Sequence, residues 1–220
     1  MYIPEHFQER DLAVLQTLVR AHPLGTWVSE VNGVLEVNHL PFILDDKRGQ
    51  FGTLVGHVAR ANGIWKVATS RVESVVVFQG PQGYITPSWY PSKHDHGRVV
   101  PTWNYAVVHA HGTPRAVDDR AWLLRHVAEL TSLHESGRET PWQVSDAPSE
   151  YIEGMVKGIV GIEIPIARLV GKWKVSQNRS VPDRMGVAAG LQAAGDMESR
   201  QVAQLVQERG NVDETPNLRR

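Results

Sequence analysis

PTWNYAVVHAHGT, residues 101–113, is the stretch that indicates most clearly how this chain folds. Its odd-numbered and even-numbered side chains form two sets, which are Trp103, Tyr105, Val107, His109 and His111 and, in alternation with them, Thr102, Asn104, Ala106, Val108 and Ala110. A period of two is that of a β-strand, in which successive side chains point to opposite faces. The stretch therefore predicts one long strand with two distinct faces.

Strand patterns also lie on both sides of this stretch. Residues 24–31 and 34–45 are separated by Asn32-Gly33, a dipeptide typical of a tight β-hairpin. The other predicted strands cover residues 51–59, 71–80, 84–90 and 159–177. Within them, the GPQG sequence at 80–83 predicts a turn, and Pro165 predicts an edge position or a bulge because proline lacks the N–H that a ladder needs.

Helical periodicity marks the remaining segments. The predicted helices cover residues 8–21, 118–134, 149–158, 183–192 and 196–209, and Asp118 or Asp119 is the expected N-cap of the second of them. Strand runs joined by short turns, with helices between the groups, predict an α+β fold in which an antiparallel sheet or barrel carries peripheral helices. We expect a single domain over residues 1–220, with a less distinct C-terminal helix and frayed tail at 193–220.

Composition excludes several classes of protein. The 220 residues contain 23 Lys and Arg against 24 Asp and Glu, so a strongly basic nucleic-acid surface is not the dominant feature. The absence of cysteine excludes disulfides, thiolate metal sites and a cysteine nucleophile, and a reducing cytoplasmic location is compatible with it. No apolar run approaches the roughly 18 residues of a membrane-spanning helix, and the N-terminus is too polar for a signal peptide. Seven Trp residues suit a core, an interface or the flat walls of a ligand site.

Motifs for metal binding and hydrolysis are weak or missing. His109 and His111 share a strand face and His94 and His96 repeat the spacing, but no third ligand is fixed, so we expect hydrogen-bonded histidines rather than a metal site. The chain has neither a G-x-S-x-G elbow nor an H-E-x-x-H helix. The glycines at 186, 190 and 195 lack dinucleotide-binding spacing, which favours close packing or helix ends.

Four segments combine cations or hydroxyl groups with aromatic rings and amides. They are GHVARAN (56–62), SWYPSK (88–93), GRVVPTWNY (97–105) and GKWKVSQNRS (171–180). Cations and hydroxyl groups suit a phosphate, amides suit the edge of a heterocycle, and aromatic rings stack on a flat one. The segments are compatible with a phosphorylated aromatic cofactor, while a purely structural role at a barrel rim or a dimer interface stays open.

A family resemblance bears on this choice. The chain resembles the PaiB family of FMN-binding negative transcriptional regulators in order and spacing over residues 1–192, through MYIPEHF (1–7), NHLPFIL (38–44), GHVARAN (56–62), FQGPQGYITPSWY (78–90), SKHDHGRVVPTWNYAVVHAHG (92–112), IVGIEIPIARLVGKWKVSQNRS (159–180) and DRMGV (183–187). The resemblance implies an antiparallel split β-barrel with peripheral helices, working as a homodimer with FMN in the crevice between the subunits.

The chain departs from this family at two places. Gly63-Ile64 precede Trp65 where the family often has a Pro and a polar or His residue, and Gln82 stands where His is common. Both places lie in a predicted loop or turn. The departures therefore put in question a histidine facing the substrate or the redox centre, and leave the fold and the phosphate segments as expected.

The resemblance and the side-chain chemistry together give candidate FMN contacts. Those for the ribityl phosphate are Arg60, Ser88, Lys93, Lys174 and Arg179. Those for the isoalloxazine face are Trp89, Tyr90, Trp103 and Asn104, and those for its edge are His57, Gln177 and Asn178. No catalytic residue and no metal ligand is assigned.

Three functions follow from the resemblance. The first is a repressor of genes of the protease-synthesis and sporulation type, the second an NAD(P)H-linked flavin reductase or oxidase, and the third a flavin or haem-related binding protein without turnover. The sequence contains no helix-turn-helix signature and no basic helix, so direct DNA binding would need a charged patch assembled by the dimer.

Overall fold

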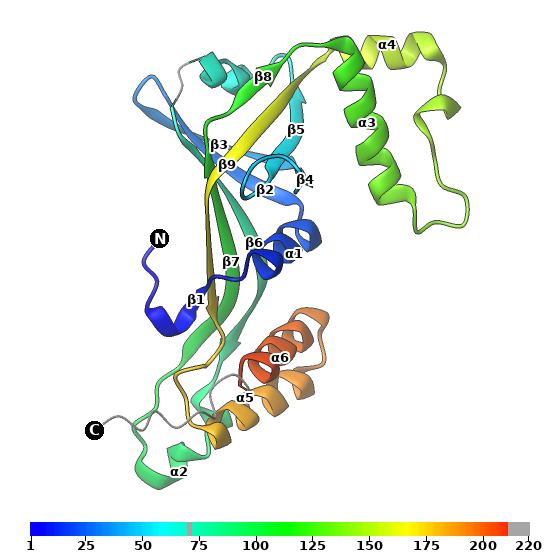
Figure 1. Cartoon of the computed structure of the whole chain (residues 1–220). Helices are drawn as coiled ribbons and strands as arrows, with labels where there is room; N and C mark the ends of the chain where they lie inside the picture. The colour runs from blue at the N-terminus through cyan, green and yellow to red at the C-terminus, as the bar shows by residue number, and fades with distance from the viewer. Residues whose placement is uncertain (70–71, 211–220) are drawn as a thin grey trace. The chain divides into compact units, whose positions relative to one another are not determined.

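The computed structural model describes residues 1–69 and 72–210, and the predicted frayed tail at 211–220 lies outside the described residues. The strands are β1 Gln8–Glu9, β2 Leu24–Val31, β3 Val34–Pro41, β4 Ile43–Asp45, β5 Thr53–Ala59, β6 Ser74–Ile85, β7 Thr102–Gly112, β8 Arg115–Val117 and β9 Ile159–Lys174. The α-helices are α1 Leu12–Ala21, α2 Ser92–His96, α3 Arg120–Glu135, α4 Ser149–Lys157, α5 Val181–Ala194 and α6 Met197–Gly210 (Figure 1). The short 3₁₀ helices are η1 Glu5–Phe7, η2 Gly63–Thr69, η3 Pro87–Trp89 and η4 Val144–Asp146.

The described strands form one sheet, in the order β3-β2-β6-β7-β9-β5-β4, with β1 and β8 also paired to β9. The hairpin of β2 and β3 is antiparallel, as are the pairs of β9 with β1, β5 and β8. Six α-helices accompany the sheet in the described residues. The α+β class with an antiparallel sheet is therefore confirmed.

The chain divides into two compact units that are interleaved in sequence. The first contains Met1–Asp11, Gln79–Val108 and Gly171–Arg220, and the second contains Leu12–Phe78 and His109–Val170. Strands β6, β7 and β9 contribute residues to both units. The single domain expected from the sequence stays a prediction.

Local sequence signals account for several features of the fold. Asn32 and Gly33 both have positive φ, at 53° and 81°, as a two-residue hairpin turn between β2 and β3 requires. The Asp119 carboxylate accepts the N–H of Trp122 at 2.7 Å and so caps α3, as predicted. The even-numbered side chains of β7 are the buried set, since Asn104, Ala106, Val108 and Ala110 are all at most 1% exposed.

In the first unit, helix α5 packs so closely against η3 that only glycine fits at two positions of the contact. A Cβ atom at Gly186 would lie 2.0 Å from the Trp89 carbonyl oxygen, and one at Gly190 would lie 2.3 Å from the Trp89 ring. Helices α5 and α6 lie side by side (Figure 1), joined at Gly195, which caps α5 with a φ of 82°. The close-packing and helix-end roles predicted for these glycines are confirmed.

The predicted turn at 80–83 is wrong, because β6 continues from Ser74 through Ile85. Tertiary contacts override the local turn signal here. Pro81 lies beyond Val75–Val77, the stretch of β6 that pairs with β2, so its missing N–H costs no bond to that strand. A Cβ atom at Gly83 would lie 3.5 Å from Leu191, so the strand is also part of the packing against α5. The strand predicted at 84–90 is accordingly the end of β6 followed by η3.

The edge position that was one of the two predictions for Pro165 is also wrong. β9 is one continuous strand with β7 on one side and β5 on the other. Pro165 stands opposite Thr53, the first residue of β5, and Ile166 donates its N–H to the Gly52 carbonyl at 3.0 Å. The proline is tolerated because it faces the point where the β5 ladder ends.

The predicted helix at 8–21 begins only at Leu12. Gln8 and Glu9 instead form β1, which pairs with Lys172 and Gly171 of β9. One carboxylate oxygen of Glu9 accepts the N–H groups of Arg10 and Asp11, both at 2.7 Å, and so fixes the chain just before α1. A short helix not predicted from the sequence, α2, also forms between β6 and β7.

We expect Gly190→Ala to lower the free energy of unfolding by about 1–3 kcal/mol, because the added methyl group overlaps the Trp89 indole. The matched control is Gly154→Ala in α4, where an added Cβ meets no atom within 4 Å and better helix propensity adds up to about 1 kcal/mol. Chemical denaturation measures both. Equal effects of the two substitutions would contradict the close contact between α5 and η3.

Candidate functional site

The predicted cofactor residues fall into both units. His57 and Arg60 belong to the second unit, and the other ten belong to the first. The two groups are therefore described separately. Within the first unit, the structure brings cations and aromatic rings together at the ends of β6, β7 and β9.

Three cations of the first unit, Lys172, Lys174 and Arg179, form what we call the cation cluster. The ammonium of Lys174 donates to the Thr102 hydroxyl and, at 2.7 Å, to the Trp103 carbonyl. Burial lowers the pKa of Lys174, and the positive charges of Lys172 and Arg179 lower it further. Among the described residues no carboxylate lies within ion-pair distance of Lys172 or Lys174, so this cluster suits an anion.

An exposed aromatic pair lies beside the cation cluster. Trp103 and Tyr84 are 47% and 52% exposed, and their ring centroids are 6.2 Å apart. The Trp103 indole donates to the side chain of Gln82 at 3.1 Å, and its carbonyl accepts from Lys174. The sequence did not single out Tyr84, although an exposed aromatic residue at a strand end was a signal that could have found it.

Trp89 and Tyr90 have packing roles in the structure. The Trp89 ring lies against Gly190, and Tyr90 is only 1% exposed. The Arg179 guanidinium lies 4.9 Å from the centre of the Tyr90 ring, an arrangement typical of a cation–π contact. Burial raises the pKa of Tyr90, and the charge of Arg179 opposes this. A contact of these two rings with a flavin stays a prediction.

Several of the predicted polar residues hold the turn that follows β9. Asn104, 1% exposed, donates to the Ser176 hydroxyl at 2.9 Å. The Gln177 side chain accepts the N–H of Val175 at 2.8 Å and donates to the Trp173 carbonyl at 2.5 Å. These bonds position the following residues Asn178, which is exposed, and Arg179. Asn104 and Gln177 therefore shape the site, and their contact with a ligand stays a prediction.

Ser88 and Lys93 form a second, exposed polar pair. The Lys93 ammonium lies 3.4 Å from the Ser88 hydroxyl, one on α2 and the other on η3. Both side chains face solvent. A hydroxyl and an ammonium at this spacing are able to bind one phosphate oxygen each, which agrees with the chemistry predicted for them.

The side chain of Arg60, in the second unit, is hydrogen-bonded to neighbouring residues. Its guanidinium forms a bidentate pair with Asp118, at 2.6 and 2.9 Å, and donates to the carbonyls of Lys157 and Ile159. The hydrogen bond to Asp118 raises the pKa of Arg60 and lowers that of Asp118. All three nitrogens are in use, so the phosphate contact predicted for Arg60 stays a prediction that would require some of these bonds to break.

His57 pairs with a second histidine that the sequence gave no reason to select. Its Nδ1 lies 3.0 Å from Nε2 of His126, which is 69 positions away on α3. The His126 ring stacks on Trp122, with centroids 5.2 Å apart and an interplanar angle of 22°. Burial lowers the pKa of both histidines, that of His126 to about 4, so the pair is neutral at pH 7.

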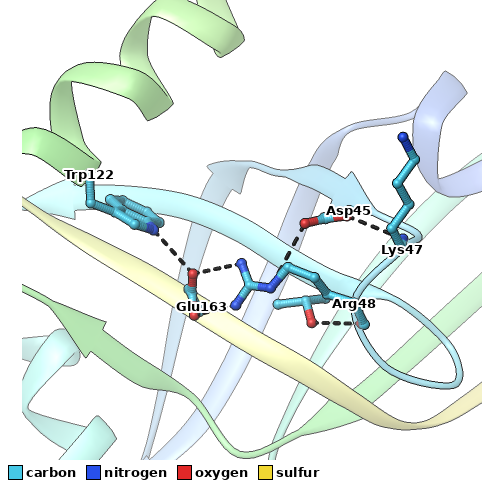
Figure 2. A network of polar contacts seen from close by, with 6 residues as sticks. Asp45, Lys47, Arg48, Trp122 and Glu163 are labelled. Carbon is cyan, nitrogen blue, oxygen red and sulfur yellow. Dashed lines mark hydrogen bonds and ion pairs between the residues drawn. The ribbon is translucent and has the colours of Figure 1, made fainter.

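A polar network fixes the ring on which His126 stacks. Figure 2 shows the Trp122 indole directed at Glu163, whose carboxylate also receives the Arg48 guanidinium. The indole lies 3.1 Å from Glu163 Oε1, and Arg48 binds both carboxylate oxygens at 2.7 and 2.8 Å. The Trp122 ring also lies against Gly161, where a Cβ would come within 2.3 Å of it.

Metal-binding clusters and membrane-spanning helices are both absent from the residues that the structure describes. In residues 1–69 and 72–210, no three His, Asp or Glu side chains gather closely enough to hold a metal ion. The ring centroids of His109 and His111 are 6.2 Å apart. None of the helices in the same ranges combines the length and the apolar character that crossing a bilayer requires.

We expect the buried His126 to make stability depend on pH. Its pKa is about 4 in the folded chain against 6.5 for a free histidine, so the unfolded chain alone binds its proton between these values. Stability is complete above pH 6.5 and falls by about 3 kcal/mol as the pH drops to 4. The variant His126→Gln is expected to show a shallower fall over this window in denaturation at several pH values. An unchanged slope would contradict the buried neutral imidazole.

Known proteins resemble this chain in sequence and in fold. Residues 1–168 match the family model described as "Putative FMN-binding domain". The chain is 34% identical over 247 residues to uncharacterized protein AN0679 of Emericella nidulans, covering 96% of this chain and 98% of that protein. It is 30% identical over 209 residues to the Bacillus subtilis "Protease synthase and sporulation protein PAI 2", covering 95% and 98%.

A solved structure supports the fold. The flavocytochrome Anf3 of Azotobacter vinelandii superposes with a TM-score of 0.55 at 14% sequence identity, covering 78% of this chain and 72% of that one. The architecture is thus that of the split barrel. Together with the family match and the relative at 30% identity, this shows that the chain belongs to the FMN-binding family of PaiB type, with a flavin as its cofactor.

Proposed function

We propose that the protein holds FMN with the cation cluster and the exposed aromatic pair of its first unit. In this proposal the phosphate binds the cations and the isoalloxazine ring lies against Trp103. The observation that carries the proposal is a group of three cations, two of them without a carboxylate partner in the described residues, beside an exposed indole. Bound FMN would supply a redox-active ring, while the chain supplies binding and orientation.

Lys174 is the best-placed phosphate ligand. Its bonds to Thr102 and to the Trp103 carbonyl use two of the three ammonium donors and leave one for an incoming oxygen. The like charges that lower its pKa make the charged cluster costly, and a phosphate dianion would remove that cost. The Arg179 guanidinium lies 4.9 Å from the centre of the Tyr90 ring, and its charge lowers the pKa of Lys174, so it is close enough to serve the same anion.

The comparison of FMN with riboflavin tests this assignment, since riboflavin has the same ring without the phosphate. We expect Lys174→Ala and Arg179→Ala each to weaken FMN binding about tenfold or more, because each removes a charge-assisted bond. Riboflavin affinity is expected to change little. Flavin fluorescence titration measures both ligands. The matched control is Lys47→Ala, an exposed lysine in a turn of the second unit. FMN affinity that is unchanged in both variants would remove the cation cluster from the phosphate site.

We further propose that the protein acts as a homodimeric, cytoplasmic transcriptional regulator of the PaiB kind. The name of the Bacillus subtilis relative supports the regulatory role, which concerns protease synthesis and sporulation. The exposed edge of the sheet supports the proposal that two copies of the chain associate. Three apolar side chains of β3 there, Val34, Leu35 and Val37, are all more than half exposed. An apolar strand at the end of the strand order is typical of a surface that pairs with another chain.

Native mass spectrometry of the FMN-loaded protein tests the assembly. We expect a species of two chains with two FMN molecules, and a shift toward the single chain in Leu35→Glu, because a charge on β3 opposes edge pairing. The matched control is Leu133→Glu, which makes the same substitution at an exposed leucine of α3, away from the edge strand. A single chain in the wild type would contradict the homodimer.

Salt-dependent retention on DNA tests the regulatory role. A protein that contacts phosphates loses affinity steeply as salt rises. Retention that falls steeply with salt would support direct repression. Absence of retention together with oxidation of NADH or NADPH in the presence of FMN would instead identify a flavoenzyme, and absence of both a flavin-binding protein without turnover.

A further inference from the structure

The second unit contains a cavity that the proposed flavin site does not use. Its volume is about 210 Å³, and residues of β5, α3, η4, α4 and β9 line it. The walls are mainly aliphatic, with Val127, Ile152 and Val156 among them. Trp142 adds a flat indole, and the remaining polar side chains are those of Thr131 and His57. An engineered apolar cavity of about 150 Å³ takes up benzene, so this one has room for a substituted single ring.

His57 lines this cavity and carries one ring nitrogen that no hydrogen bond within residues 1–69 and 72–210 uses. Its Nδ1 is occupied by His126, whereas its Nε2 has no hydrogen-bond partner among the described residues. Next to it, His126 is 3% exposed and its Nδ1 is buried without a partner. A second, polar cavity of about 100 Å³ touches His126 and is lined by Asp45, Arg48 and Glu129 among others. The two histidines thus join the apolar cavity to a polar one.

The unpartnered His126 Nδ1 decides which way the histidine pair is protonated. If His57 donated to His126, the His126 proton would sit on Nδ1 as a buried N–H without an acceptor. If His126 donates instead, Nδ1 is only an unused acceptor. Buried orphan N–H groups are rarer than under-satisfied acceptors, so the second arrangement is favoured. His57 then carries its own proton on Nε2 and offers a donor to the cavity.

We infer that this cavity binds a small neutral aromatic molecule that carries a hydrogen-bond acceptor, such as an aryl ketone, with His57 Nε2–H donating to the acceptor oxygen. The aliphatic walls exclude an ion, because an unpaired charge in such surroundings is strongly disfavoured. The Trp142 indole provides a face for the ring. The hydrogen bond from Trp122 to Glu163, a carboxylate that Arg48 also binds (Figure 2), keeps in place the ring on which His126 stacks. The inference does not rest on FMN binding.

Two probes of the same shape test the hydrogen bond. Acetophenone carries the acceptor oxygen, and α-methylstyrene has a methylene group in its place. We expect wild-type protein to bind both, and His57→Phe to lower the ratio of acetophenone affinity to α-methylstyrene affinity about fivefold, the worth of one neutral hydrogen bond. Isothermal titration calorimetry measures the four affinities without reference to flavin, so its outcome is distinct from that of the FMN titration.

Controls separate His57 from its surroundings. His134→Phe makes the same substitution at an exposed histidine of α3 that does not line the cavity, and the ratio is expected to stay at its wild-type value. Thr131→Val removes the other polar group of the wall, and a fall in the ratio there rather than in His57→Phe would overturn the role of His57.

A cavity-filling variant keeps the inference testable if His57→Phe fails to fold. Val127, a half-buried residue of the wall, is replaced by Phe, which we expect to weaken both probes at least tenfold. Wild-type protein that binds neither probe would overturn the inference, and so would a Val127→Phe variant that binds both as the wild type does.

Discussion

One carboxylate, that of Glu163, joins three separate parts of the second unit. It lies on β9, it is 9% exposed, and it receives Arg48 from the turn before β5 and Trp122 from α3. A buried carboxylate without such partners would be strongly disfavoured, so these contacts are made together or not at all. The hydrogen bonds from Arg48 lower the pKa of Glu163 and keep it charged. The stacking of His126 on Trp122, and through it the position of His57, depends on this arrangement.

The sequence predicted those parts of the fold that local chemistry controls. Asn32-Gly33 tolerates the positive φ angles that a two-residue hairpin turn requires, and the side chain of Asp119 reaches the N–H groups at the start of α3 by itself. The prediction of a turn at 80–83 was wrong because the local signal of one proline and two glycines does not include tertiary contacts. In the structure these residues continue β6, and Gly83 packs near Leu191 of α5. The family resemblance supplied the split-barrel class, which periodicity alone left open between a sheet and a barrel.

The candidate site followed the same division. Residue types were enough to select Lys174, Arg179 and Trp103 as candidate cofactor contacts, because these residues lie in sequence segments that combine charged side chains with aromatic rings. They were not enough to foresee that Arg60 binds Asp118 or that His57 binds His126, 69 positions away. Long-range pairing depends on topology, and no local motif encodes it. The near-zero net charge likewise conceals a local cation cluster, since opposite charges elsewhere cancel it in the sum.

The interleaving of the two units has a consequence for how the chain emerges from the ribosome. All segments of the second unit precede Gly171, so that unit has its full set of residues before translation ends. The first unit includes Met1–Asp11, but the strand partners of β1 are Gly171 and Lys172, which are synthesised much later. The partner of the Glu9 carboxylate, Arg209, is 200 positions further along the chain. Residues 1–11 are thus synthesised long before the residues that they contact in β9 and α6. A chaperone or a nascent-chain factor would meet this segment unpaired for most of synthesis.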